Sequence, residues 1–252
     1  MATAKHTKYS RLYFDAYRIS NWASSTNLDM SRDSVEYTPI EGEYKLFLPG
    51  KAGGTSAING FLDVADDGFD ERDAANVLAP STHYICRTVF AGTSSAAGDI
   101  AYETQEFDTG DSRAYDQAGI AMLNWSGQAT GGVVRGKVLI AETAVTGTGA
   151  VGASLNFGAT SANEVFVATI RVVSVSGAGS VTFAIQESSD DGAGDAYATI
   201  SGMTATFTAV GVSRVSTTSA TEAYKIVNAT AFSGFTSVTA IVTIGVEAAS
   251  DV

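Results

Sequence analysis

Two histidines and one cysteine decide whether this sequence can carry out nucleophilic catalysis. His6 lies in an expected N-terminal arm, and no GxSxG sequence presents a serine nucleophile. His83 and Cys86 are three residues apart in an expected strand, so their side chains point to opposite faces and form no local dyad. We therefore interpret His83 as a structural histidine and Cys86 as a small buried thiol, and we expect no catalytic residues.

A glycine-rich segment, residues 147–152 (GTGAVG), matches the GxGxxG pattern and follows a strand-like stretch. A dinucleotide site needs a helix directly after this pattern, because the helix N-terminus binds the pyrophosphate. Residues 153–162 are instead rich in Gly, Ser, Thr and Asn, which is typical of a flexible loop between domains. We therefore expect no cofactor.

Acidic residues cluster at 63–73, and Asp190, Asp191 and Asp195 form a second group. Their spacing does not match a calcium loop, and one cysteine excludes a four-cysteine zinc site. Helix capping and solvated turns account for both groups, so we expect no metal. The sequence does not exclude a catalytic pair of acids that converge from separate strands, as in glycoside hydrolases, but no local motif points to an enzyme.

The overall charge narrows the class of partner. Fifteen Lys and Arg against 27 Asp and Glu give a net charge of -12, which argues against a protein that grips nucleic acid. Charged residues make up only 17% of the 252 residues, which indicates a surface covered by partners. The apolar runs are too short to span a bilayer, and Arg11 and Asp15 interrupt any signal-like segment, so we expect a cytoplasmic product with no signal peptide and no membrane partner.

Most of the elements that must position these side chains are expected to be β-strands. One helix is expected at 71–78, capped by Asp70 and ended by Pro80. Composition shifts near residues 131–132, where Gly, Ser, Thr, Ala and Val take over. We therefore predict an all-β fold with one short helix, in which a first domain at residues 1–132 precedes a second antiparallel β-sandwich at residues 133–252. The strands expected in the second domain are 164–175, 181–186, 196–200, 205–212, 223–227 and 238–246.

Four segments of the first domain resemble phage tail-tube proteins. They are residues 8–20 (KYSRLYFDAYRIS), 32–38 (RDSVEYT), 43–50 (EYKLFLPG) and 60–63 (GFLD), in matching order and spacing. Ala16 stands where glycine is usual in that family. The second domain is similar to a β-sandwich module appended to phage virion proteins, through residues 173–177, 183–192 and 223–226.

The resemblance implies a β-barrel or sandwich protomer with a flanking helix in the tail of a siphophage virion. Such protomers form stacked rings, usually hexameric, around a DNA conduit. The implied partners are copies of the same chain, tape-measure, tail-terminator and distal tail proteins, and genomic DNA that passes without specific binding. An acidic wall suits that passage because it repels phosphates.

Two sets of site residues follow by analogy. The segment 38–54 is the expected docking loop onto an adjacent subunit or ring, with apolar anchors of the kind that dominate interfaces. Its anchors are Tyr44, Phe47, Leu48 and Pro49. The acids expected to face the lumen are Glu103, Glu106 and Asp108.

Two other classes stay in view. A capsid decoration or cement protein is also an all-β virion component, and it would form trimers or monomers on a shell instead of closed rings. A secreted carbohydrate-binding or hydrolytic sandwich would need a signal peptide or a compact catalytic set. The segment 8–63 favours the tail tube.

Overall fold

The computed structural model describes residues 10–37, 44–62, 82–89, 95–115 and 119–248, and every regular element among them is a β-strand. The helix expected at 71–78 lies outside the described residues. None of the described segments forms a helix of the length and apolar character that crossing a bilayer requires. The strands are β1 (Arg11–Phe14), β2 (Tyr17–Arg18), β3 (Ala23–Tyr37), β4 (Leu46–Phe61), β5 (Thr82–Val89), β6 (Ile100–Ala114), β7 (Met122–Ala129), β8 (Val134–Val145), β9 (Gly149–Asn156), β10 (Glu164–Ser188), β11 (Ala198–Phe207), β12 (Gly211–Thr217) and β13 (Tyr224–Ala248).

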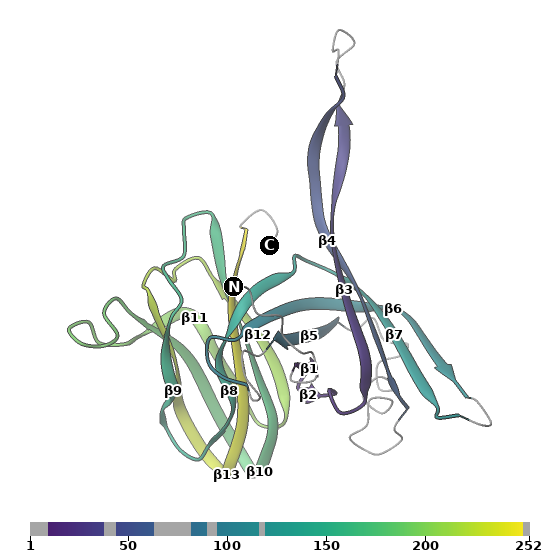
Figure 1. The fold of residues 1–252 in the computed structure, drawn as a ribbon. Helices are drawn as coiled ribbons and strands as arrows, with labels where there is room; N and C mark the ends of the chain where they lie inside the picture. Colours follow the sequence, from purple (N-terminus) through teal and green to yellow (C-terminus); the bar gives the residue numbers. More distant parts are fainter. Residues whose placement is uncertain (1–9, 38–43, 63–81, 90–94, 116–118, 249–252) are drawn as a thin grey trace, which may run out of the picture.

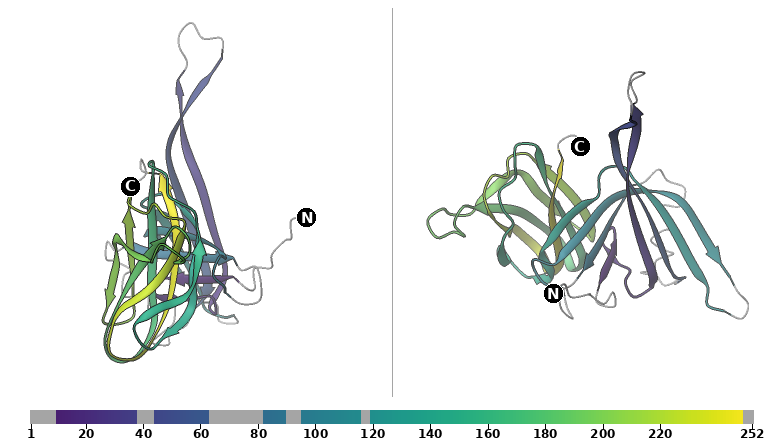
Figure 2. Two further views of the ribbon diagram at one scale, coloured as in Figure 1. Left: turned by 90° about the vertical axis from the view of Figure 1, so that its left-hand side faces the viewer. Right: turned by 45° about the horizontal axis from the view of Figure 1, so that its top comes forward.

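One antiparallel sheet runs through the molecule in the order β11-β10-β13-β8-β6-β5-β1-β2, and β3, β4 and β7 branch from it through β6. In Figure 1 the strands from β8 onward form a sandwich on the left. On the right, β6 and β7 extend outward, and the β3–β4 hairpin rises well clear of the body. Figure 2 shows the same projection of this hairpin from two further directions. The all-β fold is therefore confirmed.

Two 25-residue strands build the sandwich. β10 and β13 pair along their whole length, and the register shifts several times between Val172 and Phe183. On either side of this bend, β12 and β8 flank the pair at one end, whereas β11 and β9 flank it at the other. The 23 buried residues of the largest core cluster all lie between Leu139 and Ile244. The sequence predicted two separate strands for each of β10 and β13, but each is one strand, because the bulges bend it without ending it.

Gly234 makes the bend in β13 possible. Its φ is +78°, and an added Cβ would lie 2.4 Å from the Ala178 carbonyl oxygen. We expect Gly234→Ala to lower the free energy of unfolding by about 2 kcal/mol or more, because a left-handed backbone and a backbone clash are combined. Urea unfolding measures the effect. Gly147→Ala is the matched control, since nothing lies within 4 Å of its added Cβ, and equal losses in both variants would contradict the interpretation.

The short layer formed by β1, β5 and β6 is buried on both faces. Phe14 and Ile85 face one cluster, with Ile58, Leu123 and Trp125. Tyr13 and Cys86, their neighbours in the sequence, face a second cluster that includes Val138 of β8 and Ile241 of β13. Burial on both faces explains why β1 and β5 carry apolar side chains at consecutive positions. His83 and Cys86 do point to opposite faces, since His83 stacks on Phe14 with ring centroids 4.4 Å apart.

Candidate assembly surface

The hairpin of β3 and β4 projects beyond all other strands. β4 pairs with β7 only from Thr55 onward, so before Thr55 its strand partner is β3. We call this projecting part, residues 31–37 and 46–53, the arm. A two-stranded ribbon is marginally stable by itself in water. The arm therefore needs a partner surface to hold its shape.

Large apolar side chains are exposed on the arm and at its end. Tyr44 is 78% exposed, Phe47 59% and Leu48 57%, and Tyr37 and Leu46 are also more than half exposed. The sequence predicts a loop over residues 38–54. This prediction is wrong from Leu46 onward, because Leu46 begins β4. Residues 38–43 lie outside the described residues. Pro49 sits opposite Ser34 next to a register shift, a position where a strand tolerates proline.

Four neighbouring strands form what we call the open sheet: β3, β4, β7 and the outer part of β6 from Asp108 to Ala114. In the described part of the chain, no strand pairs with β3 on the edge away from β4. β5 stops at Thr82, opposite Phe107, so the outer part of β6 likewise has no described partner on the edge away from β7. Among the described residues, both edges of the open sheet therefore lack a pairing strand, and such edges favour pairing with another chain.

The two faces of the open sheet differ in composition. One face carries Ile58, Leu123 and Trp125 into the core. Directly opposed residues of an antiparallel pair share a face, so the pairs Ser25–Asn59 and Asn59–Asn124 mark the other face. Between Phe107 at one end and Phe61 and Met122 at the other, amide, hydroxyl and small side chains occupy this face, and Asp29 is the one charged group among them. The positions are Ser25, Asn27, Asp29, Thr55, Ala57, Asn59, Gly110, Ser112, Asn124, Ser126 and Gln128.

The polar face is accessible and internally bonded. Asn59 donates a hydrogen bond to Ser25 across the strands at 3.0 Å, and Asn27 donates to Asp29 at 2.8 Å. None of these residues is among the site residues expected from the sequence. Polar side chains do alternate with core residues at 124–128, which indicates a strand with one polar face. Only strand pairing shows that the alternating polar positions of four strands lie side by side.

Glu103, one of the acids expected to face a lumen, lies buried inside the protomer. Its residue exposure is 4%, and Arg171, fully buried on β10, donates to its two carboxylate oxygens at 2.6 Å each. Arg171 also donates to the carbonyl oxygens of Asp15 at 2.7 Å and Tyr84 at 3.3 Å. Burial by itself would lower the pKa of Arg171, but the Glu103 carboxylate outweighs it and raises that pKa. The pair therefore links the β1–β5–β6 layer to the sandwich.

The side chains of Glu106 and Asp108 lie on the opposite face of β6, toward the core cluster that contains Phe14 and Trp125. Glu106 is fully buried and accepts hydrogen bonds from Ser56 and Thr104. Asp108 accepts a hydrogen bond from the Trp125 indole at 2.6 Å, and its carboxylate lies 3.5 Å from His83. The three acids expected to line a lumen thus lie on two faces of β6 and serve structural contacts, because strand alternation separates position 103 from 106 and 108.

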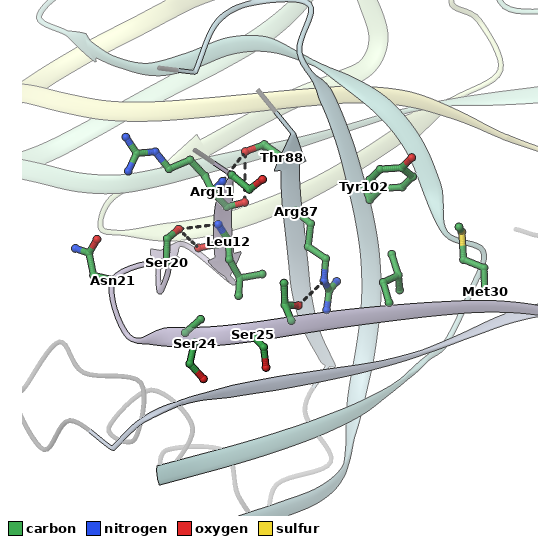
Figure 3. A pocket seen from close by; sticks show the side chains of 14 residues that line it. Arg11, Leu12, Ser20, Asn21, Ser24, Ser25, Met30, Arg87, Thr88 and Tyr102 are labelled. Atoms are coloured by element: carbon green, nitrogen blue, oxygen red, sulfur yellow. Dashed lines mark hydrogen bonds between the residues drawn. The ribbon is translucent and has the colours of Figure 1, made fainter. Parts of the chain in front are cut away.

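A groove of about 690 Å³ lies between the first residues of β3 and the β1–β5–β6 layer (Figure 3). Thr26 and Arg87 meet across it, where the Arg87 Nε donates to the Thr26 hydroxyl at 3.0 Å. The groove is lined mainly by hydroxyl and apolar side chains, with Arg11 at one end. No carboxylate or thiol is among its lining residues, so it holds no acid–base pair that would point to hydrolysis.

The remaining sequence candidates have simple structural roles. The glycine-rich segment forms β9, which pairs with β13, so the expected flexible loop is wrong from Gly149 onward and a strand stands where a dinucleotide site needs a helix. Asp190 accepts backbone hydrogen bonds from Gly194 and Asp195 in its own turn, which lowers the pKa of this carboxyl. The acidic cluster at 63–73 lies outside the described residues. Among the residues the structure does describe, no three His, Cys, Asp or Glu side chains gather as metal ligands would.

Comparison with known proteins gives structural likenesses only. No protein-family model matches the chain, and no curated protein matches it. The chain is similar to one in the virion of a native gene transfer agent particle, with 15% identity over 52% of this chain and 98% of that chain, at a TM-score of 0.44. It is similar to a chain of the PVC extracellular contractile injection system in its sheath–tube complex, with 14% identity over 54% and 93%, at 0.44. It is also similar to the Dit protein of phage SPP1, with 10% identity over 94% and 99%, at 0.35.

Proposed function

We propose that this chain is a structural protein of a phage tail, whose copies assemble side by side into closed rings that stack into a tube. The observation that carries the proposal is the open sheet, whose two edges pair with no strand in the described part of the chain. If β3 of one copy pairs with the outer part of β6 of the next copy, the same contact repeats around a ring until it closes. Closure removes both exposed edges, which would otherwise invite aggregation. The resemblance of residues 8–63 to siphophage tail-tube proteins supports a hexameric ring.

The polar face of the open sheet is the proposed channel wall. Among the described strand pairs, this face carries amides and hydroxyls and no cation. Such a wall gives phosphates no counter-charge, so duplex DNA gains no affinity from released counterions and moves past. This face replaces Glu103, Glu106 and Asp108 as the proposed lumen surface.

The C-terminal sandwich is the proposed outer part of the ring. All the large exposed apolar side chains of the described residues lie between Met30 and Ile120, and none lies in β8–β13. A unit that buries its apolar side chains internally needs no cover from neighbours. We therefore assign subunit contacts to the open sheet and the arm, and surface decoration to the sandwich.

A charge test distinguishes a channel wall from an ordinary outer face. Asn59→Lys combined with Asn124→Lys adds two cations to neighbouring strands on the polar face. We expect assembled tubes of this variant to retain a short DNA duplex in co-sedimentation at low salt, with retention lost steeply as salt rises. Wild-type tubes are expected to retain none. Thr204→Lys, on exposed β11 of the sandwich, is the control, and equal retention by both variants would place DNA binding outside the channel.

The function itself is tested by mass photometry and negative-stain electron microscopy of the purified chain. Rings or tubes support a tail-tube protein. Small closed oligomers such as trimers would favour a capsid decoration protein, and stable monomers at all concentrations would overturn self-assembly.

A further inference from the structure

A second exposed apolar cluster lies at the end of the open sheet opposite the arm. Phe61 ends β4, Tyr115 follows β6, and Ile120 precedes β7, with exposures of 40%, 72% and 68%. The register aligns Phe61 with Met122 and Met122 with Ala114, so three neighbouring strands end together here. We call these three residues the base cluster. They take no part in the core clusters described above.

The arm carries the matching cluster at the other end of the same strand. We call Tyr37, Leu46, Phe47 and Leu48 the arm cluster. β4 starts in the arm cluster and ends in the base cluster, 15 residues later, which corresponds to about 50 Å of strand. Figure 1 shows the arm pointing up and the far ends of β6 and β7 pointing down and to the right. The view turned about the horizontal axis in Figure 2 keeps them at opposite ends.

From this placement we propose that the arm cluster of one copy docks on the base cluster of a second copy, head to tail. The inference rests on the proposed self-assembly and names the surface that receives the arm. Two different apolar surfaces at opposite ends of one molecule form a heterologous contact, which does not close on itself when it repeats along the strand direction. Rings joined in this way stack without limit and all point in the same direction.

The charged groups beside the arm cluster and the base cluster favour contact between two copies of this chain. The chain as a whole carries -12, so copies repel at most surfaces. Beside the arm cluster, Lys45 pairs with Glu36 at 3.0 Å. Near the base cluster, Arg113 pairs with Asp111 on β6. Glu36 and Asp111 are thus neutralised within their own protomer, which lowers the repulsion that a second copy of this chain meets at either end.

A mixing experiment tests direction as well as contact. Phe47→Asp destroys the arm cluster but keeps the base cluster, and Ile120→Asp does the reverse. We expect neither variant to form tubes alone, because a buried Asp opposite apolar side chains is strongly unfavourable. Mixed in equal amounts, intact arms of one variant dock on intact bases of the other, and electron microscopy is expected to show stacks that end at two rings. Full tubes from Ile120→Asp alone would overturn the proposal.

Cysteine cross-linking gives a second measurement that does not depend on loss of assembly. Leu48→Cys and Ile120→Cys are introduced together, and an oxidant is added to the assembled protein. The native Cys86 is a suitable background, because burial and the nearby Glu103 raise the pKa of its thiol and its side chain is inaccessible. We expect disulfide-linked ladders from the double variant and no ladders beyond dimers from either single variant.

The outcomes distinguish failure of the head-to-tail contact from failure of the proposed tail-tube function. Tubes with ladders support the head-to-tail contact. Tubes without ladders overturn it while leaving the tail-tube proposal standing. Dimers from Leu48→Cys alone, equal in yield to the double variant's products, would indicate arm-to-arm contact and also overturn it. Absence of rings and tubes in the wild-type chain would overturn the tail-tube function itself.

Discussion

Replacing Arg171 with methionine is expected to lower the free energy of unfolding by about 3–5 kcal/mol, because it leaves the Glu103 carboxylate buried without its partner. Arg171 is fully buried and donates to both oxygens of Glu103 at 2.6 Å. The Thr243 hydroxyl also donates to Glu103, but it supplies a hydrogen bond and no charge. The loss is expected in urea or thermal unfolding followed by circular dichroism.

Two controls show whether the buried charge is the cause. Arg171→Met with Glu103→Met removes both charges, and we expect it to recover much of the loss, since apolar replacements of buried ion pairs are often neutral or stabilising. Arg18 pairs with Glu142 at 3.1 Å in a partly exposed position, so Arg18→Met is expected to cost about 1 kcal/mol or less. Equal losses from Arg171→Met and Arg18→Met would contradict the structural role assigned to Arg171.

Phe47→Asp is expected to abolish tube formation while leaving a soluble, folded protein. Phe47 is 59% exposed on the arm and touches none of the core clusters, so the substitution removes no packing from the protomer. In an assembly the same position would be covered, and burying a carboxylate there costs several kcal/mol per contact, repeated in every copy. Sedimentation and negative-stain microscopy measure the result.

Thr204→Asp serves as the matched control for Phe47→Asp, because it adds the same charge to an exposed position on β11 of the sandwich. We expect normal tubes from it. Normal tubes from Phe47→Asp would remove the arm from the assembly surface, and an unfolding midpoint lowered in the Phe47→Asp protomer would show that the arm contributes to the fold instead.

Local sequence patterns determined much of the fold. β1, β5 and the first parts of β6, β7 and β8 are recognisable from β-branched and aromatic runs, because burial of their side chains leaves a direct mark on composition. In the turn after β1 the left-handed residue is Asp15, next to the Ala16 that stands where the tail-tube family has glycine. The breaks expected inside β10 and β13 were wrong, because glycine and serine signal a turn and a bulge equally well.

The assembly surface shows the limit of local patterns. Phe47 and Leu48 were expected to be docking residues by analogy with tail-tube proteins, and the structure shows that both side chains are exposed. The burial of Glu103 was not predicted, because a carboxylate on a strand looks the same in sequence whether it meets solvent or a buried arginine. Arg171 lies 68 residues from Glu103, and only the packing of β10 against the β1–β5–β6 layer brings their side chains together.

Composition and strand periodicity by themselves determined that this chain is all-β, acidic and rich in apolar side chains that need cover, since these properties depend on near neighbours in the chain. The tertiary structure alone decided which side chains share a surface. Pairing between β3, β4, β7 and β6 gathers amides and hydroxyls from four separate segments onto one face, and it places two apolar clusters at opposite ends of β4. Both are results of long-range strand register, which no local pattern encodes.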